Sequence, residues 1–421
     1  MGDQCNGFNS SSVPITYETR ATDAIEFARQ LIESVRYAAD VDYGTSQSCV
    51  ELVVSQLCKE FHLEQLTPIL KALNEDIIDV QSCSDTYRMR KCLADLSSYK
   101  ADAQQRSWSI HEDSELILDS LAILQDLLKK SDSRVSIFVL AEDEYSRVYD
   151  LVEFYQMETR SIIRIALLET FKLILNFQPS HASILLTTVL PVEIARDVLN
   201  DGVRVQQKFR LSLQVLTLLL STGEQIPLQH YDVLNEHFAS TLLNVIEDDN
   251  QSADVASAAT ACVIAFNLHF REDNLVTLAL RQRAENATKL TESLLLLVNK
   301  KVDPVWPYKN VDCPYVSSVL KVLETLFDEE ETSRLFYTND VIVLVEIILR
   351  ELLDLLPGNT RTEYLSLLHV LTTKSTIAKL NGQLDAAILD VVNRLEQNAL
   401  EDGSSERDKQ YMADIKLRLS E

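Results

Sequence analysis

Apolar residues recur at helical spacing along almost the whole chain. The first clear stripe, with members three or four residues apart, consists of Ile25, Ala28, Leu31, Ile32 and Val35. Such spacing places apolar side chains on one side of an α-helix. Segments 162–177 and 210–220 are apolar nearly all round, which predicts central, buried helices. No segment alternates with period two for long, so the pattern does not favour a β-sheet.

The second half of the chain divides into helical segments joined by short links. We expect these helices at about 225–247, 252–270, 285–300, 314–328, 332–356, 360–379, 383–399 and 405–420. Two or three helices per unit give a repeat of roughly 40 residues, which is the range of armadillo and HEAT repeats. In such a repeat, each unit buries its apolar face on its neighbours. We therefore predict an all-α, armadillo/HEAT-like helical solenoid, and the alternative is a large irregular helical bundle.

The domain organisation follows the same pattern. Residues 1–16 are polar and rich in serine and asparagine, and they predict a flexible arm. Residues 17–254 predict N-terminal helical repeats. Residues 255–421 predict a leucine-rich, armadillo-like part that continues these repeats. Polar or proline-containing stretches predict loops at 98–112 and 301–313.

Composition supports long helices and narrows the range of partners. The 421 residues include only 8 glycines and 9 prolines, the residues that tight turns consume. A net charge of −25 repels phosphate groups, so we expect neither nucleic-acid binding nor binding to an anionic membrane. A basic protein surface would be attracted, although the charge could also serve solubility alone. The apolar stretch 341–356 contains four charged residues, so membrane insertion is not expected.

Motifs of enzyme chemistry are missing from the sequence. It contains no phosphate-binding glycine loop, no Gly-x-Ser-x-Gly elbow, no His-Glu-x-x-His and no Cys-x-x-Cys. We therefore predict a protein that is not an enzyme and that has no catalytic, cofactor or metal site. The seven cysteines are expected to be free thiols in a reducing cytosol.

A locally basic segment and one tryptophan are candidates for protein contacts. Residues 271–301 are richer in basic than in acidic side chains, and Arg281, Arg283, Lys300 and Lys301 could form a ridge that attracts a partner. The alternative is an ordinary solvated helix face. Trp306 lies in Asp-Pro-Val-Trp-Pro-Tyr, where a stiff loop could present it to a partner or pin the loop to the body.

One stretch resembles a known family. Residues 335–352 read LFYTNDVIVLVEIILREL, followed by Leu-Pro-Gly-Asn at 356–359 and Glu-Tyr-Leu-Ser-Leu-Leu-His at 363–369. Upstream, Phe-Asn-Leu-His-Phe at 266–270 and the segment 294–304 continue the similarity. The match spans roughly 255–375. It resembles the leucine-rich domain of the Nck-interacting proteins with an SH3 domain, also called WISH or DIP, and of their fungal relatives.

The resemblance implies an armadillo-like module that binds the actin-related protein 2/3 complex. Members of this family activate the complex without a pre-existing filament. The resulting linear actin filaments prime branched networks at the cell cortex and at endocytic sites, so contact with the nascent filament would be indirect. The sequence shows no SH3 domain and no proline-rich tract, which puts binding to Nck-type adaptors in doubt. It leaves open whether the chain forms a homodimer.

The polar residues at the start of the signature are the first candidates for the docking contact, namely Tyr337, Asn339 and Asp340. The alternative for this stretch is structural, because Thr338 or Asn339 could cap a helix that begins near Asp340. The alternative function is a generic armadillo adaptor that binds peptides in a groove. Such adaptors usually carry a ladder of exposed asparagine and tryptophan side chains along the groove. The chain has only two tryptophans, so this ladder is missing, which argues against the alternative.

Overall fold

The computed structural model describes residues 17–74, 78–104, 113–201, 206–271, 273–283, 287–308, 317–373, 382–399 and 405–420. Every regular element within these ranges is helical, which confirms the predicted all-α class. The predicted arm at 1–16 lies outside the described residues. No helix in the described part of the chain has both the length and the apolar character needed to cross a bilayer.

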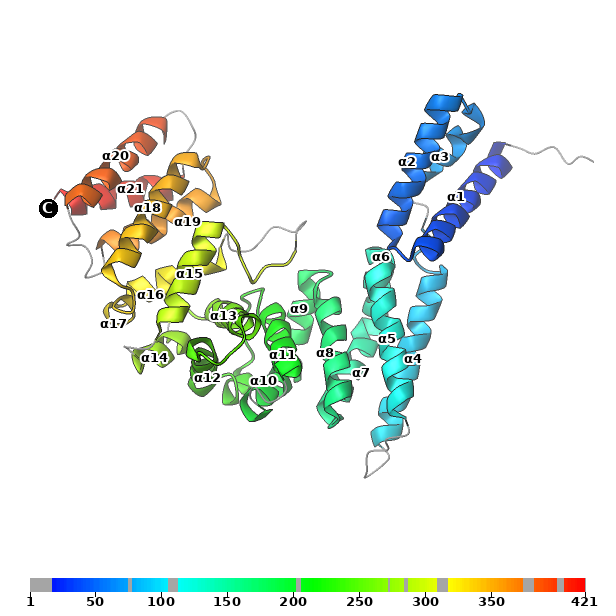
Figure 1. Ribbon diagram of the computed structural model, residues 1–421, viewed down its shortest axis with the longest axis horizontal. Coiled ribbons are helices and arrows are strands. Elements are labelled where there is room, and N and C mark those ends of the chain that lie inside the picture. Colours follow the sequence, from blue (N-terminus) through cyan, green and yellow to red (C-terminus); the bar gives the residue numbers. More distant parts are fainter. Residues whose placement is uncertain are drawn as a thin grey trace, which may run out of the picture. The chain divides into compact units, whose positions relative to one another are not determined.

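The helices have the following bounds (Figure 1). They are α1 (Tyr17–Ala39), α2 (Tyr43–Phe61), α3 (Thr67–Leu73), α4 (Ser84–Gln104), α5 (Ser114–Lys130), α6 (Ser133–Ala141), α7 (Ser146–Met157), α8 (Ser161–Leu175), α9 (Pro179–Leu186), α10 (Leu190–Asp201), α11 (Gln206–Leu219), α12 (Glu236–Glu247), α13 (Ala253–Asn267), α14 (Leu275–Arg281), α15 (Thr288–Lys300), α16 (Ser318–Asp328), α17 (Glu330–Ser333), α18 (Thr338–Asp354), α19 (Asn359–Thr373), α20 (Gly382–Ala399) and α21 (Glu406–Leu419).

The chain divides into two units. Residues 1–101 and 119–148 form the first unit, and residues 102–118 and 149–421 form the second. In the first unit, α1, α2 and α3 pack around a small apolar core. Asp42 caps α2 by accepting a hydrogen bond of 2.9 Å from the backbone nitrogen of Thr45. Arg36 on α1 forms an ion pair of 2.7 Å with Asp85 on α4, which fastens α4 to this core.

In the second unit, the helices form two rows. Row A consists of α10, α12, α15, α18 and α20, and row B consists of α8, α11, α13, α16, α19 and α21. Each helix packs against the next member of its own row, and each row A helix also packs against the row B helix that follows it in sequence. Row A helices begin at residues 190, 236, 288, 338 and 382, a spacing of 44 to 52 residues. This is the arrangement of an armadillo/HEAT-like solenoid.

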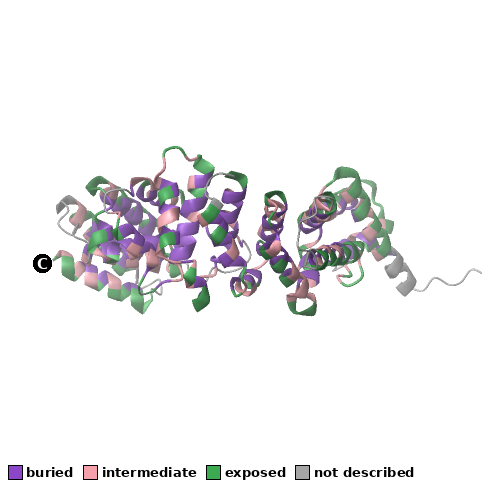
Figure 2. Ribbon diagram, turned by 90° about the horizontal axis from the view of Figure 1, so that it is seen from below, coloured by how far each residue is buried: buried purple, intermediate pink, exposed green. Residues whose placement is uncertain are grey.

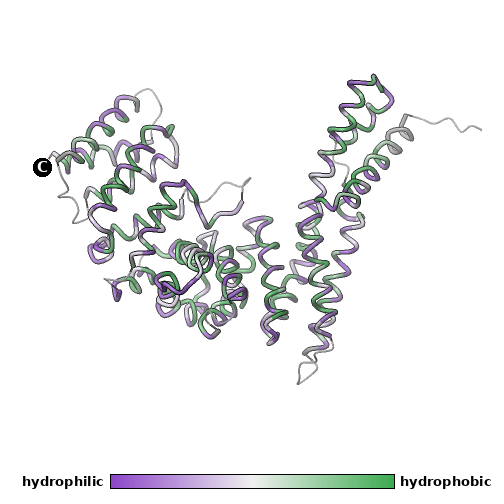
Figure 3. Tube along the Cα trace, in the orientation of Figure 1, coloured by the Kyte–Doolittle hydropathy of each residue, from purple (hydrophilic) through white to green (hydrophobic). Residues whose placement is uncertain are grey.

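The core of the second unit runs continuously along both rows. Buried residues occur in both rows, and most helices carry both hydrophobic and hydrophilic residues (Figures 2 and 3). The prediction of a buried helix at 210–220 is confirmed, since Leu213, Leu216 and Leu219 of α11 are fully buried. The prediction for 162–177 holds for most of α8, although Ile162 in its first turn is 59% exposed.

Several expected boundaries are wrong, and one helix was not predicted. The helix expected at 225–247 begins only at Glu236. Residues 98–104 belong to α4 rather than to a loop. The single helix expected at 332–356 is two helices, because the chain leaves α17 after Ser333 and α18 starts only at Thr338. The short helix α14 was not predicted. Its N-cap, Asn274, accepts hydrogen bonds from the backbone nitrogens of Val276 and Thr277.

Acidification should destabilise the fold through His181 on α9. Burial lowers the pKa of His181, although its hydrogen bond of 2.9 Å to the Ile174 carbonyl acts in the opposite direction. The unfolded chain, with an ordinary pKa near 6.5, takes up this proton before the folded chain does. Stability should therefore fall as the pH drops from 7.5 to 5.5. Urea unfolding at both pH values should show a smaller loss for His181→Gln, and an equal loss would contradict this assignment.

Candidate partner-binding surface

Two of the four residues of the predicted basic ridge, Arg281 and Lys301, are paired with acidic neighbours. Arg281, at the end of α14, forms ion pairs with Glu329 at 2.7 Å and Glu331 at 3.2 Å. Arg283 donates to the side chain of Asn244 on α12, and burial lowers the pKa of Arg283. These contacts connect α14 to α17 and to α12. Arg281 therefore does not present the free positive charge that the sequence suggested.

The C-terminal end of α15 carries the other two basic candidates. Lys300 is exposed. Lys301 follows the helix in a left-handed conformation with φ of 56°, and its Nζ lies 2.6 Å from the Glu351 carboxylate on α18. Glu351 is only 2% exposed, and it also receives a hydrogen bond of 3.3 Å from Arg350. Lys301 therefore compensates a buried carboxylate and fixes α15 to α18.

Sequence reasoning missed Glu351, although a signal was present. Positions seven apart on a helix lie within about 20° of each other. Glu351 therefore shares the side of α18 that contains the buried Leu344. An acidic residue on a buried face needs a cationic partner. The sequence therefore contained a reason to expect such a partner for Glu351.

Tyr337, Asn339 and Asp340 lie together at the start of α18. Tyr337 is the N-cap residue and is 64% exposed, and Asn339 in the first turn is exposed. The Asp340 carboxylate accepts a hydrogen bond of 3.4 Å from the Tyr337 backbone nitrogen. The cap expected at Thr338 or Asn339 is therefore wrong, because both residues are already within the helix. The negative charge of Asp340 in the first turn favours this helix start.

The structure does not gather all the predicted residues into one cluster. Asn339 and Glu351 are twelve residues apart on α18, which is roughly 18 Å along its axis. Lys300 and Lys301 therefore lie near the opposite end of α18 from Tyr337. Arg281 contacts α17, the helix that directly precedes Tyr337 in sequence.

Trp306 lies in the loop that follows α15. Its ring makes an edge-on contact with Tyr308, with 4.8 Å between ring centroids. The Tyr308 hydroxyl donates a hydrogen bond of 2.7 Å to the backbone carbonyl of Leu175 at the end of α8. Asp303 accepts hydrogen bonds from the backbone and side chain of Ser318. The described part of this loop, residues 301–308, is thus held against the body by Tyr308 and Asp303. Whether Trp306 pins the loop or contacts a partner stays a prediction.

A continuous exposed face remains on α15 and α18. On α18 it consists of Asn339, Val343, Glu346, Arg350 and Leu353, which recur every three or four residues. On α15 it includes Leu296, which is 51% exposed, and Asn299. Arg350 donates a hydrogen bond of 3.3 Å to Asn299 and so joins the two helices. We call this the α15–α18 face. Arg350 lies on this face and Tyr337 at one end of it, and arginine and tyrosine are enriched in protein interfaces.

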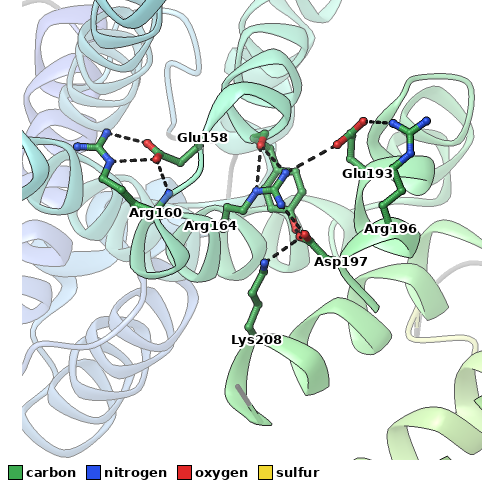
Figure 4. Close-up of polar contacts among 8 residues, drawn as sticks. Glu158, Arg160, Arg164, Glu193, Arg196, Asp197 and Lys208 are labelled. Carbon is green, nitrogen blue, oxygen red and sulfur yellow. Dashed lines mark hydrogen bonds and ion pairs between the residues drawn. The ribbon is translucent and has the colours of Figure 1, made fainter. Parts of the chain in front are cut away.

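A buried polar cluster lies elsewhere in the second unit, around Asp197 on α10 (Figure 4). Asp197 forms ion pairs with Arg164 and, at 3.2 Å, with Lys208, and it accepts a hydrogen bond of 2.5 Å from the Tyr155 hydroxyl. Arg164 also stacks over the Tyr155 ring. Burial and the nearby Asp197 charge raise the pKa of Tyr155. The cluster joins α7, α8, α10 and α11, and its burial makes it a structural element rather than a contact surface.

Within the described ranges, His, Cys, Asp and Glu side chains form no group of three or more that could hold a metal ion. The Cys262 thiol is fully buried, and burial raises its pKa to about 12. The prediction that the protein is not an enzyme stays a prediction.

Part of the second unit matches a known protein family. Residues 208–385 match the family model described as the leucine-rich domain of SPIN90/Ldb17. The matched segment begins at Lys208 in α11 and extends into the first residues of α20, so it contains the entire α15–α18 face and all eight predicted contact residues. The family resemblance noted from residues 335–369 is thereby confirmed.

Proposed function

Because the chain belongs to the SPIN90/Ldb17 leucine-rich-domain family, we propose that it binds and activates the actin-related protein 2/3 complex without a pre-existing filament. Linear filaments would result, and they would prime branched networks at the cell cortex and at endocytic sites. The family match at 208–385 carries this proposal, since the family indicates an actin-regulatory role. Contact with the nascent filament would be indirect, through the complex.

The α15–α18 face supports a docking mechanism. It lies on two helices that are joined by Lys301, Arg350 and Glu351, so its side chains are held on a preorganised surface. A rigid surface loses little conformational entropy on binding. Activation requires that the face bind the filament-like state of the complex more tightly than the inactive state. Shifting that equilibrium from 1:99 to 99:1 needs a preference of about 5.5 kcal/mol.

The experiment is a fluorescence assay of actin assembly with purified actin-related protein 2/3 complex, no filament seeds and no other activator. We expect the chain to accelerate assembly and to produce linear filaments visible by microscopy. A lack of both acceleration and binding to the complex would refute the proposed function.

The double variant Tyr337→Ala/Val343→Ala should weaken activation at least about tenfold. Both side chains are exposed, at 64% and 47%, so the fold should tolerate their removal. Exposed aromatic residues often carry much of an interface's binding energy, and about 1.4 kcal/mol corresponds to tenfold in affinity. The matched control is Tyr37→Ala/Val53→Ala, which makes the same changes at exposed positions of the first unit. Equal activity of the two variants would show that the docking surface lies elsewhere.

A further inference from the structure

A groove crosses row B on a different set of helices from the α15–α18 face. It has a volume of about 420 Å³ and is lined by residues of α8, α11 and α13. The residues that matter here are Lys172 and Asn176 on α8, Arg210 and Gln214 on α11, and Ala258 and Ala261 on α13. Pro304, from the loop pinned by Tyr308, also lines it.

Two cations, Lys172 and Arg210, line this groove, and neither forms an ion pair with a carboxylate among the residues that the structure describes. Burial lowers the pKa of Lys172, and the positive charge of Arg210 lowers it further, so the two side chains repel each other. Lys172 donates a hydrogen bond of 2.8 Å to the neutral amide of Gln214. Among the residues that the structure describes, Arg210 makes neither a hydrogen bond nor an ion pair. Two acidic groups lie nearby. Asp254 lines the groove, and the charge of Glu169 offsets part of the lowering of the Lys172 pKa.

This arrangement is unusual for this chain. Acidic side chains outnumber basic ones by 64 to 39, and cations such as Arg164, Arg281 and Arg361 have carboxylate partners. Two neighbouring, half-buried cations that repel each other cost free energy in the unbound state. An anion placed between Lys172 and Arg210 would remove this repulsion and would gain charge-assisted hydrogen bonds from both side chains.

The rest of the lining fits a peptide better than a small anion. The amides of Asn176 and Gln214 can each donate and accept a hydrogen bond, as a peptide backbone can. They lie on adjacent helices, whose axes are about 8–10 Å apart, and three extended residues span about that distance. Ala258 and Ala261 have small side chains that leave room for a backbone.

We propose that this groove binds an extended peptide segment whose Asp or Glu side chain lies between Lys172 and Arg210. This site goes beyond the proposed function. It would give the chain a second contact, with an acidic segment of a partner protein, on row B rather than on the α15–α18 face.

The test uses fluorescein-labelled pools of 12-residue peptides with randomised flanks. The two central residues are Asp-Glu in one pool and Asn-Gln in the other. Fluorescence anisotropy with the full chain should show at least about fivefold tighter binding of the acidic pool. The variant Lys172→Gln/Arg210→Gln should bind the acidic pool at least about tenfold more weakly than the unmodified chain does. Circular dichroism should show unchanged helicity.

The control Arg407→Gln/Lys409→Gln removes the same two charges from exposed positions on α21 and should bind normally. The proposal is overturned if the neutral pool binds equally well or if the control loses as much affinity. It is also overturned if inorganic phosphate displaces the acidic pool at matched concentration, which would indicate a simple anion site. The assay contains neither actin nor the actin-related protein 2/3 complex, so its failure would leave the proposed function untouched.

Discussion

Replacing Asp408 with alanine should lower the free energy of unfolding of the second unit by about 3–5 kcal/mol. Asp408 on α21 is fully buried and lies 3.3 Å from the guanidinium of Arg361 on α19, which is 2% exposed. It also accepts a hydrogen bond of 2.5 Å from the Thr362 hydroxyl. Without Asp408, the positive charge of Arg361 would lose its carboxylate partner in the interface between α19 and α21, and such a buried charge is costly.

Tryptophan fluorescence during urea unfolding measures this effect. The chain has two tryptophans, and a Trp108→Phe background leaves Trp306, which lies in the second unit, as the only tryptophan reporter. The control is Asp390→Ala, which breaks the exposed pair between Asp390 and Arg394 on α20. It should cost no more than about 0.5 kcal/mol. Similar losses for the two variants would mean that the buried pair contributes no more than a surface pair.

Replacing Asp197 with alanine should be about as damaging, at about 3–5 kcal/mol. Two cations converge on this carboxylate, and Lys208 is only 4% exposed. Removing Asp197 would take away the carboxylate that Arg164 and Lys208 share and the acceptor of the Tyr155 hydroxyl. The loss of unfolding free energy in Asp197→Ala should therefore exceed the loss caused by breaking an ordinary surface ion pair by several kcal/mol.

The same unfolding assay can separate charge from packing at this position. In the double variant Asp197→Ala/Lys208→Met, one of the two cations that faced Asp197 is gone, so part of the lost stability should return. A double-mutant cycle with Lys208→Met alone gives the coupling energy of the pair. A coupling energy near zero would show that Asp197 acts through packing alone.

The fold class was predictable because helix formation and burial leave a periodic signal in the sequence. The segments at 252–270, 383–399 and 405–420 correspond closely to α13, α20 and α21. The break before Tyr337 was not predictable in the same way, because residues 332–356 keep the apolar spacing through it. There the chain forms hydrogen bonds from Leu335 and Phe336 back to Thr332 and Ser333 instead of continuing the helix. The spacing of apolar residues does not reveal where the hydrogen bonds of a local turn replace those of a helix.

The candidate surface was only partly predictable. Tyr337 and Asn339 are exposed, and their position at a helix start could be inferred from the sequence alone. The pairing of Arg281 with Glu329 and Glu331 could not, because it depends on how α14 and α17 pack. A count of charges along the sequence treats a cation in an ion pair and a cation in solvent alike. The groove with Lys172 and Arg210 was not predicted either, because its residues come from separate helices and meet only through their packing.

The hydrogen bond between Tyr308 and Leu175 also has a mechanical consequence. In a stack where each helix contacts only its neighbours, small rotations at successive interfaces add up, so the stack can bend and twist like a spring. Tyr308 follows α15, yet its hydroxyl is bonded to the end of α8, and this link spans 133 residues of chain. It therefore acts as a brace across α11 and α13, and a pulling force should deform α8 to α15 as one stiff block.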